Sequence, residues 1–206
     1  TRVAVTCASP ELYLRRDGDY VLSRPIKGTA VTPEGLLDKD RAENVMIVDL
    51  VRNDLGVIAR PGSVGVPEFL HVETHPGLVH LVSGVSARLR SGFGWPELIG
   101  ATFPPGSVTG APKSSALRII SALEPVPRGP YCGGIGWVDA DRGVGELAVG
   151  IRSFWQTGSA SAPMLNFGTG AGITWGSDAD GEWSETELKA ANLIAVAAGS
   201  GVSVGA

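Results

Sequence analysis

Cysteine is scarce in this 206-residue sequence, occurring only as Cys7 and Cys132. Two such cysteines form neither a disulfide framework nor a Cys-x-x-Cys metal pair, which fits a reducing cytoplasm. No apolar run approaches the roughly 18 residues that span a bilayer. The formal net charge is -4, and lysine and arginine form no basic stripe and do not cluster beside an amphipathic stretch. We therefore expect no nucleic-acid partner and no membrane association.

The first residues also lack an initiator methionine and the basic segment of a signal peptide, as in a chain entered midway. Glycine, in contrast, is abundant. The 29 glycines are about double the usual share of roughly 7%. Runs at 133–136 and 168–172 would let the backbone turn sharply or approach a ligand closely.

Hydrophobic patterning predicts an α+β fold with antiparallel sheets, because helices and strands do not alternate as regular βαβ units. Nothing indicates more than one compact body. Strands are expected at residues 3–6, 11–15, 20–24, 64–73, 78–89, 134–138, 145–155 and 164–167, and helices at 38–53, 95–101, 112–123 and 182–198.

Glu43 is the first chemically costly side chain. On the predicted helix 38–53 it shares a face with Met46, Ile47 and Leu50. A carboxylate on an apolar stripe is unfavourable unless it is paired or bound to a metal. The alternative is a position at the rim of this stripe, paired with Arg41 or another neighbour, and this feature alone favours neither interpretation.

The final helix places Glu182, Glu185 and Lys189 on one face, with a favourable ion pair between the last two. Taken alone, these residues indicate a solvated helix face. The glycine run just upstream could present backbone N–H groups to an anion, although a tight turn is more common.

Lys27 lies between Ile26 and Gly28 after a predicted strand. Most such lysines are surface residues at a turn. A lysine is a nucleophile only when it is neutral, which requires desolvation or a cationic neighbour such as Arg24. Glu11 is by itself an unremarkable strand carboxylate.

The loop 106–113 offers hydroxyls, backbone N–H groups and a helix N-terminus to an anion. It is no Walker loop, because Lys113 follows a proline rather than a glycine. A plain helix entry is the alternative.

Four segments together resemble one family, the chorismate-binding enzymes. They are Arg-Pro-Ile-Lys-Gly-Thr at 24–29, Arg-Ala-Glu-Asn-Val-Met-Ile-Val-Asp-Leu-Val-Arg-Asn-Asp-Leu at 41–55, Gly-Ser-Val-Thr-Gly-Ala-Pro-Lys at 106–113, and Gly-Ala-Gly at 170–172 with Glu-x-x-Glu at 182–185. The family includes component I of anthranilate synthase and of aminodeoxychorismate synthase, isochorismate synthase and salicylate synthase. The resemblance covers nearly the whole chain and implies facing antiparallel sheets flanked by helices, with a Mg2+-dependent site between the sheets.

The resemblance assigns roles residue by residue. Glu43 and Glu185 resemble the Mg2+ ligands, with Glu182 nearby or bound through water; oxygen-only ligands suit this ion. His80 resembles the histidine near the ring hydroxyl of chorismate. The groups that would contact the substrate, mainly through its carboxylates, are Thr109, Tyr131, Arg152, Lys189 and the backbone of Gly170 and Gly172.

Lys27 points to the aminodeoxychorismate synthase branch, because anthranilate synthases usually have alanine at this position. In the implied mechanism Glu11 protonates the departing C4 hydroxyl of chorismate, Lys27 attacks C2, and ammonia then adds at C4. The ammonia would come from a separate glutamine amidotransferase subunit, in the cytoplasm.

Family members are about twice as long. Residues 1–206 therefore resemble the C-terminal portion of the catalytic domain, without the N-terminal half and with a shortened segment at 30–38. Anthranilate synthase and isochorismate or salicylate synthase remain alternatives. Two others are a non-catalytic half-enzyme that pairs with another chain and an anion-binding protein that uses the loop 106–113.

Overall fold

The computed structural model describes residues 4–159 and 161–199, so Val3, in the first expected strand, lies outside the described residues. The described chain divides into two compact units. The large unit consists of residues 9–127 and 132–149, and the small unit of residues 4–8, 128–131 and 150–199. Each unit is therefore assembled from segments far apart in the sequence.

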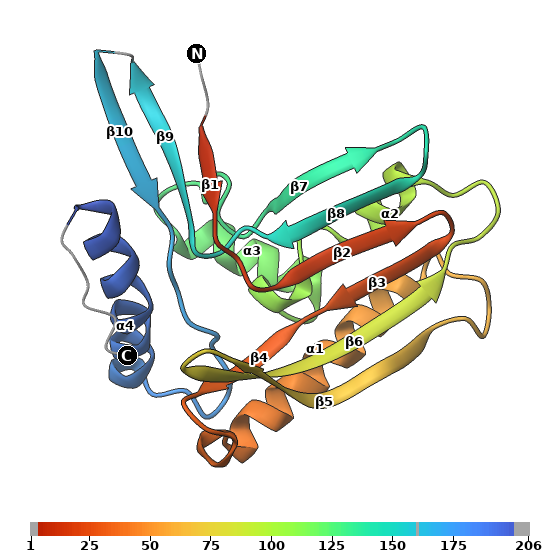
Figure 1. The fold of residues 1–206 in the computed structure, drawn as a ribbon, viewed down its shortest axis with the longest axis horizontal. Helices are drawn as coiled ribbons and strands as arrows, with labels where there is room; N and C mark the ends of the chain where they lie inside the picture. The colour runs from red at the N-terminus through yellow and green to blue at the C-terminus, as the bar shows by residue number, and fades with distance from the viewer. Residues whose placement is uncertain (1–3, 160, 200–206) are drawn as a thin grey trace. The chain divides into compact units, whose positions relative to one another are not determined.

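A seven-stranded antiparallel sheet forms the large unit (Figure 1). The long strand β6 pairs with β5 and, in successive stretches of its length, with β4 and β3. From β3 the sheet continues through β2 and β8 to β7. The strands are β2 (Leu12–Asp17), β3 (Tyr20–Arg24), β4 (Ile26–Ala30), β5 (Gly65–His75), β6 (Leu78–Arg88), β7 (Gly134–Asp139) and β8 (Val144–Val149).

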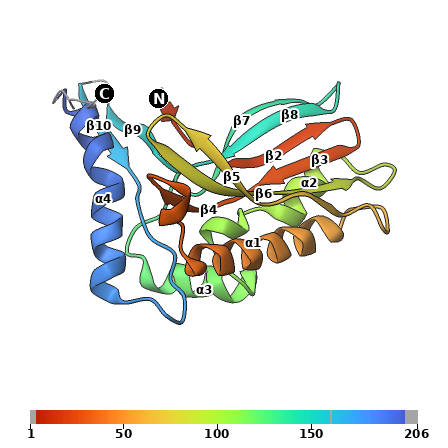
Figure 2. The same cartoon turned by 60° about the horizontal axis from the view of Figure 1, so that its bottom comes forward.

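Helix α1 (Asp38–Gly56) packs on this sheet, and Figure 2 shows α1 and α3 (Lys113–Leu123) on the same face. The buried face of α1 carries Asn44, Ile47, Val48, Asp54 and Leu55. The Asn44 amide donates to the Leu81 carbonyl of β6 at 3.1 Å and accepts a hydrogen bond from the Ser83 hydroxyl. These bonds satisfy polar groups in the core and fix α1 on the sheet. The remaining helical segments are η1 (Pro33–Gly35), α2 (Trp95–Thr102) and η2 (Gly106–Val108).

The small unit holds a three-stranded antiparallel sheet and one long helix. Strand β9 (Ser153–Ser159) lies between β1 (Val5–Cys7) and β10 (Ala162–Phe167). The rings of Phe154 and Phe167 pack 4.7 Å apart. Helix α4 (Ala179–Ala197) begins after Asp178, whose carboxylate accepts a hydrogen bond from the Gly181 N–H at 2.9 Å. This N-cap satisfies a backbone donor at the first turn.

The predicted α+β class with antiparallel sheets is confirmed. The single strand expected at 145–155 is wrong: β8 ends at Val149 and β9 begins at Ser153. Between them Arg152 has φ of 49°, a left-handed conformation that interrupts an extended chain. Strand β4 was not predicted. No helix in the described part of the chain is long and apolar enough to cross a membrane.

Candidate active site

Glu11 is the most chemically unusual residue of the large unit. It immediately precedes β2, where its N–H donates to the Ser9 hydroxyl and its carbonyl accepts from the Val149 N–H at 3.0 Å. Its side chain is buried, and burial raises the pKa of the Glu11 carboxyl from 4.5 to about 7. The nearby Ser107 hydroxyl and the charge of Lys27 partly offset this rise in pKa. The result is a carboxylic acid that exchanges its proton near neutral pH.

Lys27 lies on β4 and is half-buried. Its charge lowers the pKa of the Glu11 carboxyl, so Lys27 acts electrostatically on this acid. The next residue, Gly28, has φ of 87°, and a Cβ there would lie 2.7 Å from the Cβ of Asp40. Glycine is therefore needed beside Lys27 for both conformation and space.

Arg24, considered as the cationic neighbour that keeps Lys27 neutral, forms ion pairs with strand β5. Its guanidinium is held by two carboxylates, with Glu68 at 2.8 Å and Glu73 at 2.9 Å. The positive charge of Arg24 is therefore neutralised by strand β5.

His80 is buried on β6. Its Nδ1 is 2.8 Å from the Thr29 hydroxyl, and β4 and β6 pair Thr29 with His80 in register. The His75 ring packs edge-on against His80, with centroids 5.2 Å apart. The sheet therefore holds the His80 imidazole in one orientation. Its partner Thr29 lies on β4, the strand that also carries Lys27.

Glu43 lies at the border of the buried face of α1, with 17% of its side chain exposed. Of the expected apolar stripe, Ile47 is buried and Leu50 is half-buried, whereas Met46 is 48% exposed, so only part of the stripe faces the core. Lys39 lies 3.8 Å from the Glu43 carboxylate. Glu43 therefore lies at the rim of the buried face beside a cation, which is Lys39 rather than Arg41.

A largely buried ion pair between Lys113 and Asp54 holds the loop 106–113 against α1. The Lys113 ammonium lies 2.6 Å from the Asp54 carboxylate of α1 and donates to the Thr102 carbonyl at 3.0 Å. Burial raises the pKa of Asp54, an effect that the ammonium partly offsets. The Thr109 hydroxyl donates to the Pro105 carbonyl at 3.0 Å. Lys113 is therefore engaged inside the fold and ties the loop to α1.

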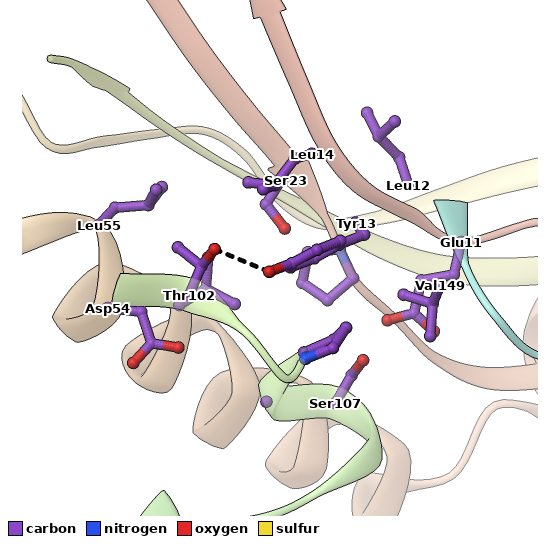
Figure 3. A pocket seen from close by; sticks show the side chains of 14 residues that line it. Glu11, Leu12, Tyr13, Leu14, Ser23, Asp54, Leu55, Thr102, Ser107 and Val149 are labelled. Carbon is purple, nitrogen blue, oxygen red and sulfur yellow. Dashed lines mark hydrogen bonds between the residues drawn. The ribbon is translucent and has the colours of Figure 1, made fainter. Parts of the chain in front are cut away.

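A small cavity of about 20 Å³, enough for roughly one water, separates the loop from the sheet. In Figure 3 the Ser107 hydroxyl and the Glu11 carboxylate point toward one another at this cavity. The Tyr13 hydroxyl bonds that of Thr102 at 2.8 Å on its other side. Ser107 was not assigned a role from the sequence, because its partner Glu11 comes from a distant segment.

The small unit brings together four of the residues assigned to substrate and metal. Lys189 on α4 forms a 2.6 Å ion pair with Glu185, as the sequence predicts, and donates to the Gly170 carbonyl at 3.3 Å. A Cβ at Gly170 would lie 2.9 Å from the Tyr131 hydroxyl. Glycine at 170 thus lets this hydroxyl approach the backbone.

Three other residues of the small unit that were assigned to substrate or metal have different surroundings: one is buried and two are exposed. Glu182 is buried and its carboxylate accepts a 2.6 Å hydrogen bond from Ser177. Arg152 and Gly172 are exposed. The left-handed conformation of Arg152 is unfavourable for a residue with a side chain, a feature common at binding sites.

The residues expected to bind metal are all carboxylates, on α1 of the large unit and α4 of the small unit. Within the described part of each unit, no three histidine, cysteine, aspartate or glutamate side chains gather as a metal-binding group. Glu182 and Glu185 lie one turn apart on α4.

The large unit thus carries a buried carboxylic acid that feels the charge of a lysine, and a buried histidine on the same sheet as that lysine. Residues 1–195 match the family model described as chorismate binding enzyme. The chain therefore belongs to the chorismate-binding enzyme family.

Curated relatives carry two different names. The chain is 41% identical over 194 residues to anthranilate synthase component 1 of Saccharolobus solfataricus, covering 88% of this chain and 45% of the relative. It is 43% identical over 206 residues to aminodeoxychorismate synthase component 1 of Klebsiella aerogenes, covering 93% and 44%. The chain thus spans less than half the length of these relatives.

Solved structures agree in fold. Anthranilate synthase component I from Streptococcus pneumoniae superposes with a TM-score of 0.79 at 34% identity, covering 93% of this chain and 43% of that one. The menaquinone-specific isochorismate synthase of Escherichia coli gives 0.80 at 26% identity, covering 93% and 45%.

Proposed function

We propose that this chain carries the catalytic residues of an aminodeoxychorismate synthase, which converts chorismate and ammonia to 4-amino-4-deoxychorismate. The observation that carries the proposal is the buried Glu11, whose carboxyl has a raised pKa and feels the charge of Lys27. An acid with a pKa near 7 can give a proton to a leaving hydroxyl, and a nearby lysine can be the nucleophile.

The first step uses both residues. The step needs Lys27 as the free amine and Glu11 as the protonated acid, so one proton first passes from the Lys27 ammonium to the Glu11 carboxylate. The Lys27 Nζ then forms a bond to C2 of chorismate, the two ring double bonds shift, and the C4–O bond breaks. Glu11 donates its proton to the departing oxygen, which leaves as water. Burial favours the protonated form of Glu11 before this step, because the neutral acid is the form that an apolar environment stabilises.

The second step reverses the shift of the double bonds. Ammonia forms a bond to C4, the C2–N bond to Lys27 breaks, and the lysine leaves as the amine. The amino group therefore ends at C4. His80, oriented by Thr29, is assigned to the region of the ring hydroxyl.

The carboxylates of the substrate need positive charge and N–H donors. The small unit offers these in Lys189, Tyr131 and the Gly170 backbone, and in the exposed Arg152, whose guanidinium suits a bidentate clamp. Gly172 would add a further backbone donor, and Thr109 of the large unit a hydroxyl.

Mg2+ fits the chemistry of the donor set, because Glu43, Glu182 and Glu185 offer only carboxylate oxygens. Glu43 and Glu185 would hold the ion, and Glu182 would contact it directly or through water. When bound, Mg2+ supplies positive charge to a substrate carboxylate. Glu185 would exchange its Lys189 partner for this role.

Anthranilate synthase is the second candidate, because relatives with that name match this chain at 41% identity. The two activities differ in whether the amine is attached at C4 or C2. Relatives named as component 1 support a separate partner, which would be a glutamine amidotransferase that supplies ammonia.

The test is to incubate the chain with chorismate, Mg2+ and ammonium and to locate the amine by mass spectrometry and NMR. We expect a 4-amino product, absent from Lys27→Ala. Lys27→Arg is the matched control, because it keeps the positive charge but loses the nucleophile, so it should be equally inactive. A 2-amino product, or full turnover by either variant, would contradict the proposal.

A further inference from the structure

Ser107 is the residue of the loop 106–113 that reaches Glu11. Its hydroxyl and the Glu11 carboxylate point toward one another at the small cavity between loop and sheet, which both side chains line (Figure 3). The hydroxyl lowers the pKa of the Glu11 carboxyl. Ser107 thus faces the proposed acid, and the resemblance assigns it no role.

The backbone that carries Ser107 is closely fitted to α1. A Cβ at Gly106 would lie 2.5 Å from Cδ2 and 2.9 Å from Cγ of Leu50, so only glycine allows this approach. At the far end of the loop, the ion pair of Lys113 with Asp54 ties the loop to the same helix at 2.6 Å. Both ends of the segment are therefore held, and the Ser107 hydroxyl has a defined position relative to β2.

Few charged or titratable groups face Glu11. Lys27 approaches from β4, while Asp54 of α1 and Tyr13 of β2 line the same cavity. Asp54 is neutralised by Lys113, and Tyr13 is bonded to Thr102 with its pKa raised by burial. Ser107 and Lys27 are consequently the two groups that favour the ionised form of Glu11.

We propose that Ser107 is a positioning residue for Glu11: its hydroxyl orients the carboxyl group and stabilises the carboxylate left after proton donation. The inference rests on the proposed role of Glu11 as the acid. A hydrogen bond to the charged form favours ionisation, so the serine keeps the acid able to release its proton despite burial.

Removing the Ser107 hydroxyl should change the pKa of Glu11 in one direction. Without it the ionised form of Glu11 loses a donor, and the pKa of the carboxyl rises further above 7. A rise of about one pH unit is expected for one hydrogen bond to a charged group. A merely structural role for Ser107 would change stability without moving this titration.

The experiment follows the carboxyl carbon of Glu11 by NMR in the full chain labelled at glutamate, from pH 5 to 9, with the signal assigned by Glu11→Gln. The wild-type midpoint should lie near 7. Ser107→Ala and Ser107→Cys should move it upward by about one pH unit, whereas Ser107→Thr, which keeps a hydroxyl, should restore it. Ser114→Ala, an exposed serine on α3, is the matched control and should leave it unchanged.

An unchanged midpoint in Ser107→Ala, or an equal rise in Ser107→Thr, would overturn the proposal. If Ser107→Ala does not fold, Ser107→Cys provides the same comparison with a side chain of similar size and a weaker donor. The titration needs no turnover. Loss of chorismate conversion in the wild type would refute the proposed function, while the NMR comparison would still decide the role of Ser107.

Discussion

Glu11→Gln should change the way in which the stability of this protein depends on pH. Burial raises the pKa of Glu11 from 4.5 to about 7, so the folded state binds a proton more tightly than the unfolded state does. Stability from this group is fully present below pH 4.5 and is lost as the pH rises toward and through 7. The total loss is about 3 kcal/mol, on the order expected for a shift of this size. A glutamine at position 11 cannot ionise, so the Glu11→Gln variant does not lose this stability as the pH rises.

The assay is urea unfolding of both proteins at several pH values between 4 and 8. The free energy of unfolding of Glu11→Gln minus that of the wild type should rise by about 3 kcal/mol across this range. Other titrating groups cancel in the difference. A difference that stays constant with pH, or falls, would refute the assignment of Glu11 as a buried acid with a raised pKa.

Two further predictions concern the surroundings of the site. Asp54→Asn and Lys113→Met should each lower the free energy of unfolding in urea by about 3 kcal/mol, because each leaves a buried charge unpaired. The double variant should lose less than the sum of the two single losses. Additive losses would show that the pair is not coupled. Gly28→Ala should cost about 1–3 kcal/mol, since it adds a clash with Asp40 to an unfavourable φ of 87°. Gly92→Ala, at φ of 82° with open space, is its control for thermal unfolding, and equal losses would exclude the clash.

The local elements were predictable where one physical signal dominates. The hairpin signal predicts β3 with its observed bounds, Tyr20–Arg24. The strand β4 was missed because Lys27-Gly28-Thr29 has no alternating pattern, and its extended form depends on pairing with the distant β6. Glycine with positive φ inside this strand produces a shift of register that no local pattern indicates.

The residues of the site were likewise predictable only where a local sequence motif contains them. The motifs indicated Glu11, Lys27 and His80 as catalytic residues, and their catalytic roles stay a prediction; in the structure Lys27 acts electrostatically on the buried Glu11. The ion pair of Asp54 with Lys113 was not predicted, because it joins α1 to the start of α3 and depends on their packing in three dimensions. The same holds for Ser107.

The interleaved segments of the small unit affect how the chain can fold during synthesis. Strand β1 pairs only with β9 among the described strands, with Val5 opposite Trp155, so its hydrogen-bonding partner is made long after it. At about 5–20 residues per second, the ribosome needs roughly 10–30 s to synthesise the intervening chain. All seven strands of the large unit have been made by then, whereas β1 still has exposed edges. A chaperone that binds extended segments would therefore find β1 accessible throughout this interval.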